Sequence, residues 1–376
     1  MTTGALAAAL ALACSSVQAD FSRNYISIVG SSTLQPFSVA VAEQIGKSKK
    51  IKPPMIESTG TGGGITLFCE GSGSGSPDVV NASRPMRQRE LEQCRSAGAG
   101  DVVEVKVGYG GPVLIQSSHS PIAGMTRSEL YRALAQHIPD PACAPGCEKL
   151  ITNPNNRWKQ INAAWPDVGI DILGPPVSSG LSEALVDAVL EPVCDGVPWL
   201  AAKKSRNDSD YKRACRSIRS DGHYTEETGA AVLGQADAGA GRIGIVSYAA
   251  FSTSRSSLLP ISVDGVKPDD ANLRSQLYPL TKPLLFYVKR SHAGSVPGLE
   301  AYLAEFTSDK AWAAEGYLAR KGLVPMTEAE RAAYGRVARE LTVMTAAGQA
   351  PQLPAAEPVP VRPAATAKAT RKKKGK

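Results

Sequence analysis

The chain has 376 residues, which is long enough for two ordinary domains with hydrophobic cores. Its net charge of +7 would suggest binding to nucleic acid, but seven basic residues and no acidic one lie between Arg362 and Lys376. The rest of the chain is neutral overall, which excludes a folded body that is strongly basic throughout.

The first nineteen residues are apolar and rich in alanine, and they predict a secretory signal peptide that is cleaved before Asp20. The apolar run is too short to cross a bilayer as a helix. No Lys or Arg precedes it, so the true start codon could lie upstream. Cys14 could instead carry a lipid, but Ala11 stands where that signal prefers leucine. We therefore expect a periplasmic or otherwise secreted protein.

Six cysteines remain after Cys14, and their order in the chain suggests the disulfides Cys69–Cys94, Cys143–Cys147 and Cys194–Cys215. Disulfides suit an oxidising compartment. Cys143 and Cys147 could alternatively form half of a zinc site, but no second pair or nearby histidine completes it, so we predict no bound metal.

Short β-rich runs alternate with helical stretches along the whole body, which predicts an α/β fold with largely parallel sheets. In chain order we expect strands at 25–30, 53–59, 77–82, 102–118, 169–174, 242–251, 258–265 and 280–290. We expect helices at 36–47, 61–70, 87–98, 126–138, 181–193, 296–308, 310–321 and 328–344. Thr126 and Glu129 have the spacing of a capping box at the start of the fourth helix.

The tail from about Ala346 is rich in Ala, Pro and Lys, and it has little apolar surface to bury, so we predict that 346–376 is disordered. Its positive charge could bind an anionic surface such as cell-wall polymer, lipid or nucleic acid. A solubilising appendage is an equally good interpretation.

Four loops rich in small polar residues follow predicted strands and precede predicted helices. They read "GSSTL" (30–34), "STGTGGG" (58–64), "NASRP" (81–85) and "PVSSGLS" (176–182). Such loops lie at the carboxyl ends of strands, where open α/β sheets bind ligands. Free amides at a helix start, together with hydroxyl groups, can hold an oxyanion. One such loop alone is usually a helix cap, but four together predict an anion-binding cleft.

The sequence gives no support for catalysis. "GAGRIG" (239–244) has the spacing of a dinucleotide-binding loop, but it precedes a strand instead of opening a helix. No G-x-S-x-G motif is present, and the four histidines share no motif with a serine or cysteine. We therefore predict no catalytic residues, no cofactor and no enzymatic activity. A phosphate-ester hydrolase would need a nucleophile and a base that we do not find.

The ordered motifs "IVGSSTLQPF", "ESTGTGGGI", "VVNASRPM", "GPPVSSG", "GRIGIVSY" and "YPLTKPLLFYVKR" resemble the periplasmic phosphate-binding proteins of phosphate ABC transporters. The resemblance implies a two-lobed type II periplasmic-binding-protein fold, with a mostly parallel sheet in each lobe and a ligand cleft between them. We place the chain crossings near 110–113 and 278–284. Lobe I then comprises 20–112 with 279–345, and lobe II comprises 113–278.

The resemblance also implies which residues bind phosphate. They are Ser32, Thr33 and Leu34 of the first loop, Thr61 of the second, Ser83 and Arg84 of the third, and Ser178, Ser179 and Gly180 of the fourth. Some family members have an aspartate where this chain has Arg84, and an arginine before the fourth loop falls here near Pro175 and Pro176. Leu181 and Glu183 also depart from the family, and Glu183 would repel an anion if it faced the cleft.

We therefore expect a monomeric solute-binding protein that captures inorganic phosphate by hinge closure and delivers it to an ABC transporter permease. One alternative is a phosphate-binding or adhesion protein that the basic tail retains at a surface and that is not coupled to transport. Another is a binder of a different tetrahedral oxyanion, given Leu181 and Glu183.

Overall fold

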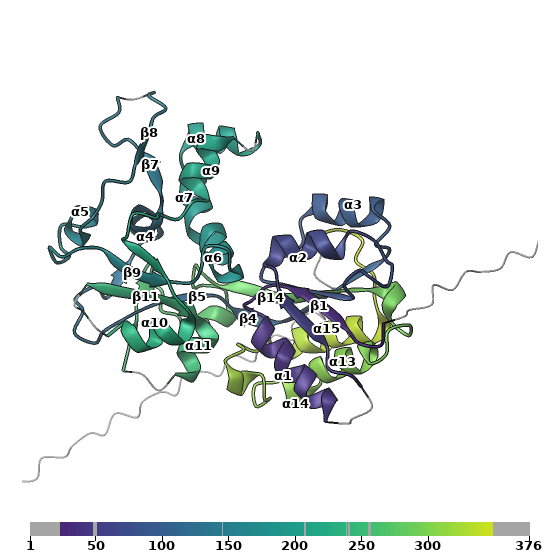
Figure 1. Ribbon diagram of the computed structural model, residues 1–376. Coiled ribbons are helices and arrows are strands. Elements are labelled where there is room, and N and C mark those ends of the chain that lie inside the picture. The colour runs from purple at the N-terminus through teal and green to yellow at the C-terminus, as the bar shows by residue number, and fades with distance from the viewer. Residues whose placement is uncertain are drawn as a thin grey trace, which may run out of the picture.

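The computed structural model describes residues 23–47, 51–144, 146–206, 208–237, 239, 241–254 and 257–348 (Figure 1). The predicted signal peptide, its cleavage point and Cys14 lie outside the described residues, as does the predicted tail from residue 349 onward. Ala347 is described, and its amide donates to Gln88 Oε1 at 3.1 Å. Within the described residues, no helix is both long enough and apolar enough to cross a membrane.

Two five-stranded sheets form the centres of two lobes (Figure 1). The first sheet has the order β2 (Met55–Ser58), β1 (Ser27–Gly30), β3 (Val79–Ala82), β14 (Lys282–Lys289) and β4 (Val102–Gly110). The second has the order β10 (Tyr224–Glu226), β9 (Asp171–Gly174), β11 (Arg242–Ser247), β5 (Pro112–Gln116) and β12 (Leu259–Pro260). We call the regions around these sheets lobe I and lobe II.

Each sheet contains one strand that is antiparallel to both its neighbours. That strand is the first one after the chain crosses from the other lobe. β14 is antiparallel to β3 and β4, and β5 is antiparallel to β11 and β12. The remaining strands of each sheet run in one direction. The prediction of a mostly parallel sheet in each lobe is confirmed.

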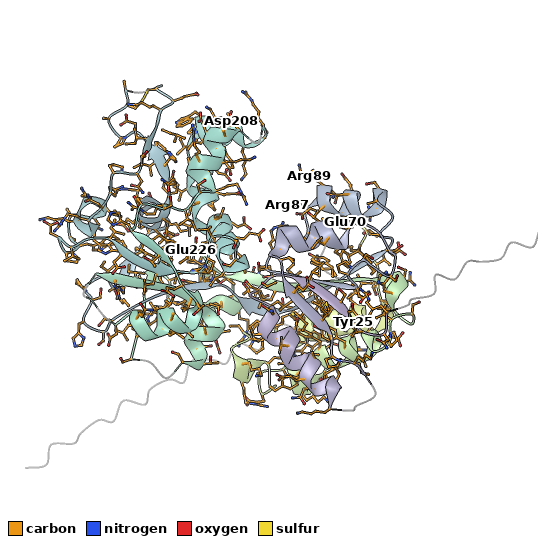
Figure 2. All side chains as sticks on the ribbon, viewed as in Figure 1. Tyr25, Glu70, Arg87, Arg89, Asp208 and Glu226 are labelled. Atoms are coloured by element: carbon orange, nitrogen blue, oxygen red, sulfur yellow. A yellow bond between two sulfur atoms is a disulfide. The ribbon has the colours of Figure 1, made fainter. Side chains whose placement is uncertain are left out.

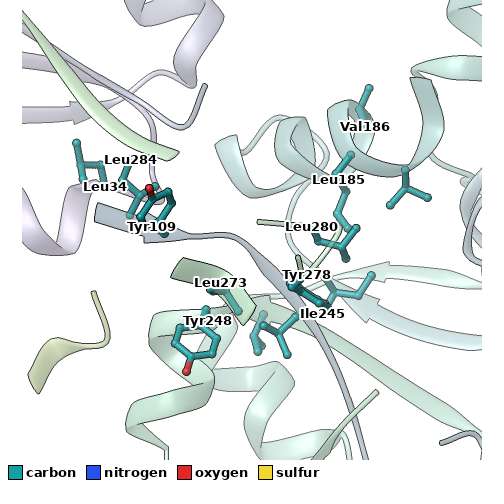
Figure 3. Packing of buried hydrophobic residues seen from close by; sticks show 14 of the residues in the cluster. Leu34, Tyr109, Leu185, Val186, Ile245, Tyr248, Leu273, Tyr278, Leu280 and Leu284 are labelled. Atoms are coloured by element: carbon teal, nitrogen blue, oxygen red, sulfur yellow. The ribbon is translucent and has the colours of Figure 1, made fainter. Parts of the chain in front are cut away.

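The two segments that connect the sheets lie side by side at Gly111. This residue separates β4 from β5 and has φ +145°, and a Cβ atom there would come 2.3 Å from the Leu280 carbonyl oxygen. Only glycine suits both the backbone angle and the close approach. Hydrophobic packing continues through this junction, with Leu34, Tyr109 and Leu284 on the lobe I side and Leu185, Ile245 and Leu280 on the lobe II side (Figure 3).

Helices flank both sheets. Lobe I has α1 (Gln35–Gly46), α2 (Thr61–Phe68) and α3 (Gln88–Ser96), and after β14 it has η2 (Arg290–His292), α13 (Leu299–Phe306), α14 (Asp309–Trp312), η3 (Ala319–Lys321) and α15 (Glu328–Glu340). Lobe II has α4 (Arg127–Leu134), α5 (Trp158–Ile161), α6 (Gly180–Leu185), η1 (Val186–Leu190), α7 (Glu191–Asp195), α8 (Pro198–Lys204), α9 (Ser209–Cys215), α10 (Gly229–Gln235), α11 (Tyr248–Thr253) and α12 (Asp270–Arg274). Two-stranded pairs complete it, β6 (Gly124–Met125) with β13 (Ser262–Val263) and β7 (His137–Pro139) with β8 (Leu150–Thr152).

Several element predictions are wrong in part, including the strand expected over 258–265, which is two short strands in different sheets. The helix expected over 126–138 ends at Leu134, because His137–Pro139 pairs with β8. The strand expected over 242–251 ends at Ser247, whose hydroxyl accepts from the Ala250 amide and so starts α11. The helix expected over 310–321 is only α14, since turns and η3 follow. The capping box of Thr126 and Glu129 and all three predicted disulfides are confirmed.

Candidate functional site

The first loop leaves β1 at Gly30 and turns into α1 beside β3. Gly30 has φ +118°, and a Cβ atom there would come 2.1 Å from the Asn81 carbonyl oxygen. The next amide, that of Ser31, donates to that same oxygen at 2.8 Å. The first and third loops are therefore joined by their backbones, and glycine is required where they meet.

The first loop has two buried hydroxyl-bearing residues, Ser31 and Thr33, and Thr33 differs from Ser31 in its hydrogen bonding. The Thr33 Oγ1 atom is buried and has no hydrogen-bond partner among the described residues. The amides of Thr33 and Leu34 donate within the loop, to Ser31 Oγ at 3.2 Å and Ser31 O at 3.3 Å. The Leu34 side chain is fully buried in the hydrophobic core. A buried polar atom without a partner is costly, so the Thr33 hydroxyl is the group in this loop with most to gain from a ligand.

Thr61 and Ser83 join the second and third loops. Thr61 begins α2, and its hydroxyl accepts from the Ser83 amide at 3.1 Å and lies 3.1 Å from the Ser83 hydroxyl. Both residues are buried. Gly64, one turn into α2, packs against β1 so closely that a Cβ atom would come 2.5 Å from Gly30 Cα. The glycines of the second loop therefore bring the start of α2 against the first loop.

Arg84 is the cation of this cluster, and one edge of its guanidinium is already paired. Its Nη1 and Nη2 atoms each donate to a carboxylate oxygen of Glu90 at 2.8 Å. Its Nε atom is buried and makes no hydrogen bond within the described chain. The carboxylates of Glu90 and Glu183 raise the pKa of Arg84 above its ordinary value, although burial alone would lower it. Glu90 thus fixes the guanidinium through its two Nη atoms and leaves the Nε–H as a donor without a hydrogen bond.

Arg84 differs from the neighbouring arginines of lobe I. Arg87 and Arg89 lie exposed on the outer surface at the start of α3 (Figure 2). Arg84 keeps only 8 % of its surface exposed. Burial strengthens the hydrogen bonds of a charged group, so Arg84 is the arginine of this segment that suits a binding site.

The fourth loop starts α6 and reaches lobe I. The Ser179 hydroxyl accepts from the Ser182 amide at 3.2 Å and caps the helix. A Cβ atom on Gly180 would come 3.2 Å from the hydroxyls of both Ser31 and Ser32, so the two lobes touch here. Ser178 is exposed. The fourth loop therefore approaches the first loop through Gly180, and its serines serve mainly the helix start and the surface.

Glu183 lies on α6 where this helix faces α2 (Figure 1). Its Oε2 atom accepts from the Thr61 amide at 3.1 Å, and its Oε1 atom lies 3.7 Å from Arg84 Nε. Together with the contact of Gly180 on Ser31 and Ser32, these distances bring all four predicted loops to one place. The two lobes are in contact at this position.

Lys282 is a charged neighbour that the sequence reasoning missed. It is the first residue of β14, and burial lowers its pKa against the opposing field of Asp187, Glu183 and Glu191. Its position within the predicted crossing near 278–284 was the available signal, but a lysine at the start of a strand is usually a surface residue. Lys282 adds a second cation to the lobe I side of the junction.

Two sizeable cavities lie away from the loops. One of about 530 Å³ is lined by residues of α13, α14 and α15, and one of about 700 Å³ is lined by residues of α11 and α12 and the segment that follows α14. None of the predicted site residues lines either cavity. In the described part of the chain, no group of three or more His, Cys, Asp or Glu side chains could hold a metal ion.

Comparisons with known proteins agree with this architecture. Residues 15–310 match the model of a family described as "PBP superfamily domain". Protein SphX of Synechococcus elongatus is 26% identical over 282 residues, covering 73% of this chain and 71% of that protein. The phosphate-binding protein PstS of Staphylococcus saprophyticus is 21% identical over 292 residues, covering 76% of each chain.

The solved structures give the fold. The crystal structure of an ABC-type phosphate transport receptor from Vibrio cholerae superposes with a TM-score of 0.56 at 16% identity. The superposition covers 79% of this chain and 98% of that one. The chain therefore belongs to the PBP superfamily, a family of solute-binding proteins, and has the two-lobed type II periplasmic-binding-protein fold.

Proposed function

We propose that this protein captures inorganic phosphate between its two lobes and delivers it to an ABC transporter. The observation that carries the proposal is the meeting of four strand-to-helix loops around buried donors, above all the Thr33 hydroxyl and Arg84 Nε. Relatives named as phosphate-binding proteins and a phosphate transport receptor support phosphate as the ligand.

Lobe I would supply most of the hydrogen bonds to the phosphate. Its donors are the Thr33 and Ser83 hydroxyls, the Thr61 amide and hydroxyl at the start of α2, and the Nε edge of Arg84. Ser32 and the Leu34 amide are the further lobe I groups in this proposal. Each hydrogen bond to a charged oxygen contributes about 1.5–3 kcal/mol.

Lobe II would close the site through Ser178, Ser179 and Gly180. Gly180 contacts the first loop in this structure, and in the closed form this contact would hold the start of α6 at the ligand position. The two connecting segments beside Gly111 would form the hinge, at the lobe boundaries predicted from the sequence. Closure would replace water around the anion with fixed dipoles, and the closed form is the one that a permease would recognise.

Calorimetric titration of the exported, purified protein with phosphate, sulfate and molybdate tests the ligand. We expect phosphate to bind more tightly than the other two anions. Tight binding of sulfate or molybdate with no heat from phosphate would contradict the assignment. In the same protein, deletion of 349–376 should leave phosphate affinity unchanged, because we assign the tail no part in the site.

A further inference from the structure

The carboxylate of Glu183 lies beside the Thr61 amide and Arg84 Nε, two donors that we propose bind the phosphate. One of its oxygens accepts from the Thr61 amide at 3.1 Å, and the other lies 3.7 Å from Arg84 Nε. The Glu183 carboxylate, which belongs to lobe II, is therefore close to both lobe I atoms that a bound oxyanion would contact.

The surroundings of Glu183 are those of a bound anion. The Thr61 amide is the first amide of α2 that has no acceptor within its own helix, and the positive dipole end of this eight-residue helix faces the carboxylate. Cβ atoms on Gly60 and Gly62 would come 3.6 and 3.5 Å from the Glu183 oxygens, so glycines line the approach. The Glu183 side chain retains 21% of its surface exposed, which leaves solvent a route to it.

Glu183 has no capping role that would account for its position. Ser179 caps α6 by accepting from Ser182, which occupies the third helical position, where a capping box would need Glu or Gln. Glu183 is one residue later, and its carboxylate contacts the other lobe instead of the amides of its own helix. Gly180 fixes this placement, because it packs directly against Ser31 and Ser32.

We propose that Glu183 is an internal anion that competes with the captured oxyanion for the Thr61 amide and Arg84. The inference rests on the proposed function of the same site. When the site is free of phosphate, the carboxylate holds the lobes together through these donors. A dianion can take both donors only if the carboxylate withdraws, because two like charges in contact repel each other strongly. Glu183 therefore weakens ligand binding and favours a closed form without ligand.

Removing the charge should tighten binding. In Glu183→Gln and Glu183→Ala, calorimetry should give phosphate dissociation constants at least several-fold lower than that of the wild-type protein. Small-angle scattering without phosphate should give a larger radius of gyration for both variants than for the wild type. Glu43→Gln, an exposed carboxylate on α1, is the matched control and should behave as wild type. Melting temperatures establish that each variant is folded.

The two readouts separate this inference from the proposed function. Equal or weaker phosphate binding in both folded Glu183 variants would overturn the competition while leaving phosphate capture intact. If neither the wild type nor the variants bind phosphate, the proposed function is wrong. The scattering data alone then test whether Glu183 holds the two lobes together. Equal ligand-free radii for wild type and variants would then overturn the inference, and expansion of the variants would support an internal latch.

Discussion

The two halves of the candidate site are built from the same kind of loop but offer different chemistry. In lobe I, Thr61, Ser83 and Arg84 are buried, and contacts within the lobe fix them in place. In lobe II, Ser178 is exposed, Ser179 caps its own helix, and Glu183 brings a negative charge. A small polar loop before a helix therefore does not by itself define an anion-binding surface. Burial and the nearest charges decide whether it can bind one.

Of the substitutions in lobe I, replacement of Arg84 should reduce phosphate affinity the most. Arg84→Ala removes the cation, and we expect phosphate affinity to fall by about 10- to 100-fold, as for loss of hydrogen bonds to a charged group. Calorimetry measures the change. Arg89→Ala, which removes an exposed arginine of α3, should leave the affinity unchanged. An Arg84→Ala protein that is folded and binds normally would place the site elsewhere.

Replacement of Thr61 tests the contribution of a lobe I hydroxyl group to phosphate binding. Thr61→Val keeps the shape of the side chain and removes its hydroxyl, so phosphate affinity should fall by about 10-fold, the loss expected for one such hydrogen bond. Thr66→Val on the exposed side of α2 is the control, because the Thr66 hydroxyl donates to the Gly62 carbonyl of its own helix. Equal affinities for the two variants would remove Thr61 from the site.

Gly180 tests the contact between the halves. In Gly180→Ala, the new methyl group would come 3.2 Å from the Ser31 and Ser32 hydroxyls, so the lobes cannot close fully without a shift. We expect a several-fold loss of phosphate affinity with an unchanged melting temperature. Gly229→Ala is closely matched, since Gly229 also opens a lobe II helix behind a capping hydroxyl but has open space around it. Similar affinities in the two variants would contradict closure at Gly180.

Replacement of Glu90 tests whether its ion pair with Arg84 stabilises the fold of lobe I before any ligand binds. Its bonds to Arg84 and Arg87 lower the pKa of Glu90, although burial alone would raise it. A lowered folded-state pKa stabilises the fold above the ordinary value of 4.5, and this contribution is lost as pH falls below it. Glu90→Gln should therefore melt below the wild type at pH 7, and thermal melts should show the difference shrinking below pH 4.5. A constant difference would mean that the charge of Glu90 is not its source.

Ser178 should have the smallest effect of the predicted site residues. It is exposed and precedes the capping residue of α6, so we expect Ser178→Ala to change phosphate affinity by less than about twofold, in keeping with an exposed position. Calorimetry provides the measurement. A tenfold loss would show that the lobe II loop rearranges to bring Ser178 onto the ligand, and the contrast between the halves would then be smaller than described.

Local sequence signals predicted the positions of the loops because each is set by neighbouring residues. Thr126 and Glu129 start α4 as their spacing indicates, and the strand-to-helix changes at Gly30 and Thr61 follow the turn chemistry. The strand at His137–Pro139 was missed because its stabilising partner lies at 150–152 and leaves no local mark. The short helix after Ser247 was missed because the apolar run continues across the capping residue.

The chemistry of the site was less predictable, because it depends on contacts between distant segments. Glu183 and Thr61 are 122 residues apart, so the possibility that Glu183 would face an anion could be named from the sequence, but its bond to the Thr61 amide could not. Glu90 is only six residues from Arg84, but no motif in the sequence marks it as the partner of that guanidinium. A hydrogen bond between residues of different lobes depends on how the lobes are placed relative to each other, and no local sequence pattern encodes that.

A crystal structure of the protein grown with phosphate would locate the ligand and the Glu183 carboxylate together. We expect phosphate oxygens within hydrogen-bond distance of the Thr61 amide and Arg84 Nε, with the Glu183 carboxylate moved off both atoms. Phosphate bound away from the four loops, or Glu183 still on the Thr61 amide at saturating phosphate, would contradict the site proposed here.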